Sequence, residues 1–298
     1  MNASRTYRID LIALAISIVS IAASAPIIVA FTGPALAIAF WRNVIGATVT
    51  APLLLRQRAA LAALPRRSWL SMIAAGVCLG IHFATWIPSL RYTSIAASTA
   101  LVATQVVWAA IIAFATGHRA PRAEWIGIAV ALTGIVILTG IDVSLEPRAL
   151  LGDLLALLGA MSAAAYVAIG QRVRNTLPLA TYTTVVYAVA AGVLLVLCLV
   201  TGTQLWGFSA RDWWLIAAIT VFAQFGGHTL MNLALRSFSA TAVSLAILLE
   251  VPGATLLGWI WPGQTPPWQL LPGALLVLWG LVLVLRASRD QVVTEPGV

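Results

Sequence analysis

Long apolar segments follow one another along almost the whole chain, and they constrain its fold more than any other feature. A helix needs about 20 residues to cross the ~30 Å hydrocarbon core of a membrane. Of the 298 residues, 61% are hydrophobic and 9% are charged, whereas soluble proteins carry about 25% charged residues. The sequence therefore predicts an all-α, polytopic membrane protein. Ten transmembrane helices are expected, over residues 10–30, 34–55, 69–90, 94–116, 125–141, 154–171, 181–201, 213–235, 240–260 and 270–285.

The second half of the chain repeats the first at a distance of about 145 residues. Leu90–Ala96 (Leu-Arg-Tyr-Thr-Ser-Ile-Ala) returns as Leu235–Thr241 (Leu-Arg-Ser-Phe-Ser-Ala-Thr). Because each copy holds five spans, an odd number, the second copy enters the membrane from the opposite side, and the repeats are inverted. We assign residues 1–146 to the first repeat and 147–298 to the second, which ends in a short cytoplasmic tail. Further matched pairs are Trp69 with Trp214, Gln105 with Glu250, Pro121 with Pro267, Gly127 with Gly273, and Gly134 with Gly280.

The arginines indicate the direction of insertion. If the N-terminus is cytoplasmic, thirteen arginines lie on the cytoplasmic side and three on the far side, which is the bias of cytoplasmic loops. Both termini are then cytoplasmic, in a bacterial inner membrane. The net charge of +8 reflects this topology, so no nucleic-acid partner is expected. Cys78 and Cys198 lie inside apolar spans, which indicates neither a disulfide framework nor a metal site, and no cofactor is expected.

Two polar residues occupy matching places in the middle of their spans. An ionisable side chain at the bilayer centre costs about 2.5 to 3.5 kcal/mol, so such residues are candidates for function. Glu250 lies near the middle of the ninth span and its partner Gln105 near the middle of the fourth. Pro252 should bend the ninth helix beside the carboxyl group. Glu250 could instead be a buried structural acid, protonated or paired with Arg42.

Other polar groups form helical patterns. His82 and Trp86 are four residues apart in the third span and share a face. Gln224, His228 and Asn232 recur every four residues in the eighth span. This stripe is expected either to line a wet pathway or to make hydrogen bonds between helices.

The second span carries Arg42 and Asn43 near its middle. An arginine there needs a partner, carbonyl groups or water. It could be a counter-ion for Glu250 or for a substrate carboxylate, or it could be structural. Trp86 and Trp108 could form apolar walls for a ring-bearing solute. The predicted substrate-binding residues are His82, Trp86, Gln105, Trp108, Asn43, Gln224, His228, Asn232 and Glu250.

With these features the chain resembles a known family. The two five-helix repeats, the Leu-Arg-Tyr-Thr-Ser-Ile-Ala-Ala-Ser run with its Leu-Arg-Ser-Phe-Ser-Ala-Thr-Ala copy, and the glycine-rich last spans resemble the EamA-type group of the drug/metabolite transporter superfamily, over residues 8–287. The stretch from His82 to Trp108 resembles the bacterial aromatic amino acid exporters of that group. The resemblance implies ten helices, a central cavity and export of small metabolites. The family commonly has a proline late in the fourth span; Val107 stands there, whereas Pro252 is present in the ninth, so matching kinks are not implied.

Two other classes of function compete with transport. An enzyme is not indicated, because the chain has no His-Glu-x-x-His, no Walker A loop, no serine nucleophile elbow and no pair of intramembrane carboxylates. A channel would need rings of like groups or a carbonyl filter. The expected function is a carrier that exports small metabolites, foremost amino acids and preferably aromatic ones, by alternating access. Other small solutes or drugs are the alternative cargo, and the expected partners are this substrate and the lipid bilayer.

The arginine distribution makes a testable prediction about topology. A cysteine that replaces Ala62, in the loop between the second and third spans, should face the cytoplasm. In a variant that lacks Cys78 and Cys198, a membrane-impermeant maleimide should label position 62 in inside-out vesicles but not in intact cells. Labelling from outside intact cells would contradict the assigned direction.

Overall fold

The structure is a computed structural model that describes residues 3–56, 61–62, 64–93, 95–117, 120–139, 146–174, 176–260 and 268–294. These residues form helices joined by turns and contain no strand. Within them, eight helices are long and apolar enough to cross a membrane, and the apolar stretch Ala240–Gly253 is shorter. The all-α class predicted from the sequence is confirmed.

A helix or a broken helix covers every expected span. The division between the two halves is expected between residues 146 and 147, directly after residues 140–145, which lie outside the described part, and it stays a prediction. In chain order the elements are α1 (Ala3–Ala22), α2 (Ser24–Ala30), α3 (Ala35–Leu55), α5 (Arg66–Tyr92), α6 (Ile95–Ala103), α7 (Gln105–Ala115), α8 (Arg122–Thr139), α9 (Pro147–Val173), α10 (Leu179–Val200), α11 (Ala210–Ile219), the π-helix η1 (Thr220–Thr229), α12 (Leu230–Ala234), α13 (Ala240–Ile247), α14 (Glu250–Ile260) and α15 (Leu270–Thr294).

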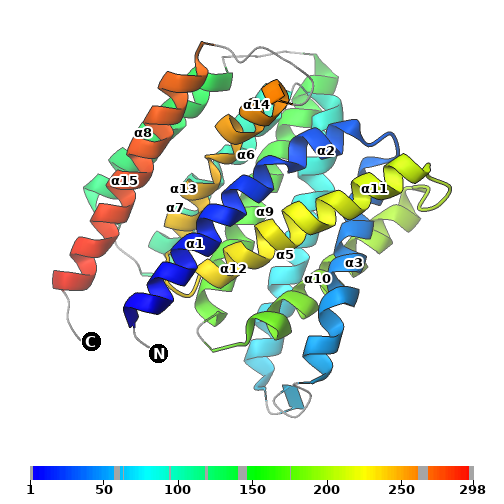
Figure 1. Ribbon diagram of the computed structural model, residues 1–298, viewed down its shortest axis with the longest axis horizontal. Coiled ribbons are helices and arrows are strands. Elements are labelled where there is room, and N and C mark those ends of the chain that lie inside the picture. Colours follow the sequence, from blue (N-terminus) through cyan, green and yellow to red (C-terminus); the bar gives the residue numbers. More distant parts are fainter. Residues whose placement is uncertain are drawn as a thin grey trace.

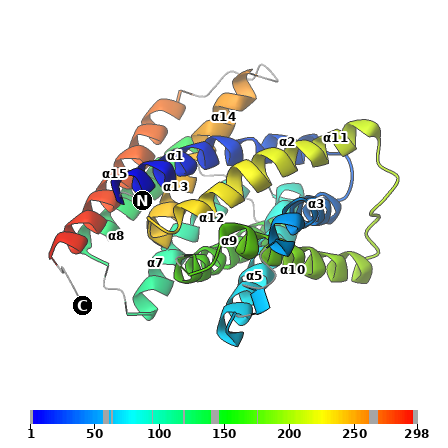
Figure 2. The same cartoon turned by 60° about the horizontal axis from the view of Figure 1, so that its bottom comes forward.

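The helix contacts follow the repeat. The pair α8 and α15 lies at one end of the bundle, and the pair α3 and α10 lies at the other (Figures 1 and 2). Between them α5 packs along α9, and its equivalent in the other repeat, η1 with α12, packs along α1. If each helix is replaced by its equivalent in the other repeat, the contact of α5 with α9 becomes the contact of η1 and α12 with α1.

Glycines bring α8 and α15 into backbone contact. A Cβ at Gly127 would lie 2.8 Å from the carbonyl oxygen of Gly280, and one at Gly134 would meet the carbonyl of Gly273. Such close approach is how helices associate without a hydrophobic driving force. The residue numbers run in opposite directions, so the helices are antiparallel, and exchange of the halves converts one glycine contact into the other. A pseudo-twofold axis therefore passes between these helices at right angles to them, as inverted repeats require.

The fourth and ninth spans are both broken, at equivalent positions. The fourth breaks at Thr104, between α6 and α7, and the ninth breaks at Leu248 and Leu249, between α13 and α14. The fourth span needs no proline for this, because the Thr104 hydroxyl donates to the carbonyl of Leu101 at 2.6 Å and the amide of Val107 donates to the carbonyl of Thr104 at 2.9 Å. These tight local bonds replace the α-helical ladder. The two breaks thus lie at equivalent positions although only the ninth span contains a proline.

The glycine contact gives the second prediction. Gly280→Leu should destabilise the protein by about 1 to 3 kcal/mol, because the new side chain would meet the Gly127 backbone, which cannot rotate away. Gly192→Leu is the matched control, since no atom lies within 4 Å of a Cβ at that position. Thermal unfolding of the purified variants in one detergent would measure both effects. Equal melting temperatures for the two variants would contradict the packing assigned to α8 and α15.

Candidate functional site

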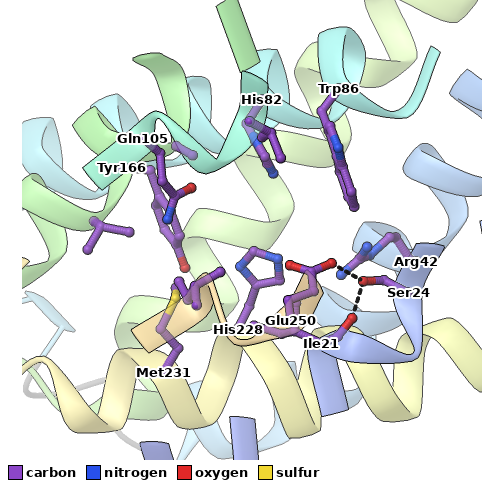
Figure 3. Close-up of a pocket in the computed structure, with 14 residues that line it drawn as sticks. Ile21, Ser24, Arg42, His82, Trp86, Gln105, Tyr166, His228, Met231 and Glu250 are labelled. Atoms are coloured by element: carbon purple, nitrogen blue, oxygen red, sulfur yellow. Dashed lines mark hydrogen bonds between the residues drawn. The ribbon is translucent and has the colours of Figure 1, made fainter. Parts of the chain in front are cut away.

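A cavity lies at the seam between the two repeats (Figure 3). The free volume inside it is about 50 Å³, below the roughly 300 to 1,000 Å³ of most small-molecule pockets, so the cavity is narrow in this structure. Its lining consists of Ile21, Ser24, Arg42, His82, Trp86, Val102, Gln105, Ala163, Tyr166, Val167, His228, Met231, Ile247 and Glu250.

The lining itself follows the pseudo-twofold axis. Four pairs of residues that lie 145 positions apart line the cavity. A fifth pair, Phe83 and His228, makes an edge-to-face contact with ring centroids 5.2 Å apart. Equivalent residues can touch only at the axis, so the cavity lies where the repeats face each other. The four lining pairs are Ile21 with Tyr166, Trp86 with Met231, Val102 with Ile247, and Gln105 with Glu250.

Gln105 and Glu250 enter the cavity at the two helix breaks, since each is the first residue of the second half of its span. A carboxylate at a helix N-terminus is favoured by the helix dipole, which suits Glu250 at the start of α14. The hydrogen bond that the Glu250 carboxyl group makes within the protein is weak. The Ser24 hydroxyl lies 3.3 Å from Glu250 Oε1 and also donates to the carbonyl of Ile21. A hydroxyl has one proton to donate, so Ser24 cannot fully satisfy both acceptors.

Arg42 extends from α3 into the cavity, and neighbouring side chains contact one side of its guanidinium group. Its Nε donates to Gln224 Oε1 at 2.8 Å, and Gln224 Nε2 donates in turn to Asn43 Oδ1 at 3.1 Å. The guanidinium carbon lies 4.4 Å from the centroid of the Phe83 ring, at a cation–π distance. The whole side chain is buried, and its Nη2 has no partner. Arg42 and Glu250 line the same cavity without forming an ion pair.

His82 and Trp86 project from α5 toward Glu250 and His228 (Figure 3). Their rings are stacked, with centroids 5.5 Å apart and planes 10° apart. His82 Nδ1 lies 3.0 Å from the carbonyl oxygen of Gly159, which can only accept. The ring proton therefore sits on Nδ1, which leaves Nε2 as an acceptor.

Four of the predicted binding residues do not line the cavity: Asn43, Gln224, Asn232 and Trp108. Asn43 and Gln224 are fully buried behind Arg42 and hold it in place. Asn232 donates its amide to the hydroxyl of Tyr166, which does line the cavity. Three of the four thus support lining residues from behind, whereas the half-buried Trp108 makes no such contact.

The π-helix explains why the predicted polar stripe does not share one face. The prediction of the stripe assumed an α-helix with 3.6 residues per turn, but residues 220–229 form the wider turns of a π-helix. The Thr229 hydroxyl donates to the carbonyl of Gln224 at 3.1 Å, and the Tyr187 hydroxyl lies 2.8 Å from Thr229 Oγ1. Gln224 is thereby directed to α3, while His228 faces the cavity.

Sequence reasoning missed several lining residues, most notably Ser24, Tyr166 and Met231. Met231 could have been found, because it is the repeat partner of Trp86. Ser24 and Tyr166 lie in the first and sixth spans, which also contain Ser17, Ser20 and Ser162, so the sequence does not show which of these hydroxyls faces a cavity and which makes a helix contact.

Comparison with known proteins adds the family. A search of curated proteins found no match. One solved structure, described only as "Crystal structure of protein", matches with a TM-score of 0.76 and 18% sequence identity, over 97% of this chain and 99% of that chain. At that identity the likeness shows the fold alone. The model of the EamA-like transporter family matches residues 9–140 and again residues 150–286, one match for each repeat. Because these matches cover both halves of the bundle and the cavity between them, the chain belongs to the EamA-like transporter family.

Proposed function

We propose that this membrane transporter exports small metabolites from the cytoplasm, foremost amino acids and preferably aromatic ones, by alternating access. Membership of the family makes it a membrane transporter of small solutes. The observation that carries the finer proposal is the seam cavity, in which a flat aromatic wall faces one acid and one base.

The walls of the cavity suit a ring. Trp86, backed by the stacked His82, presents a flat surface, and offset or edge-on contacts between aromatic groups contribute about 0.5 to 1.5 kcal/mol beyond the area they bury. Aliphatic side chains from both repeats, Val102 and Ile247, complete an apolar surface. These walls suit contact with a planar apolar side chain, for which the cavity must widen.

The charges in the cavity favour a zwitterion over a phosphate ester. A sugar nucleotide or phosphate ester carries several negative charges and would require several cations. The lining holds one arginine and one glutamate, together with two histidines. A solute with one positive and one negative group matches this set.

The arrangement also favours a carrier. Sites at the seam of inverted repeats, formed by broken helices near the membrane midplane, are typical of transporters that expose one site to each side in turn. We further propose that the protein lies in a bacterial inner membrane with both termini cytoplasmic. In support, α1 begins and α15 ends at the same end of the bundle (Figure 1).

Counterflow in proteoliposomes tests the transport proposal. Liposomes loaded with unlabelled tryptophan, phenylalanine or threonine should accumulate the labelled amino acid transiently, and faster for the two aromatic ones. Trp86→Ala should reduce exchange of tryptophan and phenylalanine by about three- to tenfold and spare threonine, because it removes the ring contact.

Trp108→Ala is the matched control, since Trp108 lies outside the cavity lining and should leave the preference unchanged. Equal exchange of all three amino acids by the wild type, or an unaltered preference in properly inserted Trp86→Ala, would contradict the aromatic assignment. Amino acid flux that is not stimulated by amino acid on the opposite side of the membrane would contradict the carrier mechanism.

A further inference from the structure

Polar atoms without partners gather around the seam cavity. Nine buried side-chain nitrogen or oxygen atoms of the described residues have no hydrogen-bond partner. Four of these nine belong to lining residues, and all four are nitrogens: Arg42 Nη2, Trp86 Nε1, Gln105 Nε2 and His228 Nδ1. Buried polar groups are normally satisfied, and an unmet donor calls for an explanation such as a missing ligand.

Three of these nitrogens can only donate: those of Arg42, Trp86 and Gln105. A ligand that satisfies them must offer acceptors, and it must offer negative charge to Arg42. The carboxylate is the group that matches a guanidinium best. Since Gln224 and Phe83 already hold the Nε and the face of the guanidinium, Nη2 is the part left for the ligand.

Glu250 has the opposite requirement. Its carboxylate can only accept hydrogen bonds when it is ionised, and the hydrogen bond that it accepts from the Ser24 hydroxyl is long, at 3.3 Å. Arg42 is the arginine that lines the same cavity, and these two side chains form no ion pair. An unpaired charge is expensive in a membrane interior, so a cationic group of the ligand would stabilise it.

We propose that the transported molecule is held by its two charges, with its carboxylate at Arg42 and its ammonium group at Glu250. This assignment rests on the proposed function and deepens it, because it names the α-amino acid backbone as the part recognised by charge. The N–H groups of Trp86 and Gln105 then donate hydrogen bonds to the remaining lone pairs of the substrate carboxylate or to polar groups of the substrate side chain.

Analogues that lack one charge test the assignment. The reference compound is the amino acid that the full-length protein exchanges fastest in proteoliposomes. Its competitors are the amine without the carboxylate and the acid without the amine; for tryptophan these are tryptamine and indole-3-propionate. The wild type should prefer the amino acid to either analogue by about tenfold or more, since a site built for a polar group rejects a ligand that lacks it.

The two variants should then fail in opposite ways. Arg42→Gln should weaken inhibition by the amino acid and by the acid, and leave the amine unchanged. Glu250→Gln should weaken inhibition by the amino acid and by the amine, and leave the acid unchanged. Glutamine occupies the equivalent position 105, so Glu250→Gln is expected to fold. If Arg42→Gln does not fold, Arg42→Lys, which keeps the charge but loses the paired N–H donors of the guanidinium, should weaken inhibition by the acid and the amino acid to a smaller extent and leave the amine unchanged.

Equal inhibition of the wild type by the amine and the amino acid would overturn the assignment, as would variants that weaken all three compounds by one factor. A wild type that exchanges no amino acid would refute the proposed function itself. A protein that exchanges amino acids without charge discrimination would refute only the present inference.

Discussion

In a hydrocarbon surrounding, a polar group of this protein must find its partner within the protein, and most features of the structure depend on that constraint. Threonine and serine hydroxyls donate to carbonyl groups three or four residues back in most of the spans, as at Thr50, Thr104 and Thr183. Where a helix breaks, such local bonds take over the backbone groups that the α-helix no longer satisfies. The breaks of the fourth and ninth spans can therefore lie inside the membrane, and they place Gln105 and Glu250 at the seam.

The same constraint explains how much of the fold could be predicted from the sequence. Apolar segments separated by arginine or glycine and proline locate the spans, because the bilayer sets their length. The repeat predicts which helices are equivalent, and the contacts between Gly127, Gly134, Gly273 and Gly280 show that equivalence in space. The break at Thr104 could not be foreseen from proline, since a threonine hydroxyl and tight turns produce it there.

The candidate site was predictable to a smaller extent. Gln105 and Glu250 stand out because the repeat places two polar residues at one depth, and His82 and Trp86 because they share a helical face. Gln224 and Asn232 were expected on the same surface as His228, but the π-helix changes the number of residues per turn and directs them to neighbouring helices. Such local geometry determines whether a polar residue lines a cavity or instead supports a lining residue. Residue spacing alone does not reveal this geometry.

The pairing of Gln105 with Glu250 has a consequence for how a solute would sit. Two identical halves would create a cavity with two identical ends, in which a small dipolar molecule could lie either way round. An amide in one half and a carboxyl group in the other make the ends chemically different, and Arg42, which comes from one half only, adds to the difference. The two halves differ at these few positions and remain alike in their helix arrangement. They can therefore move in equivalent ways while the substrate binds in one orientation.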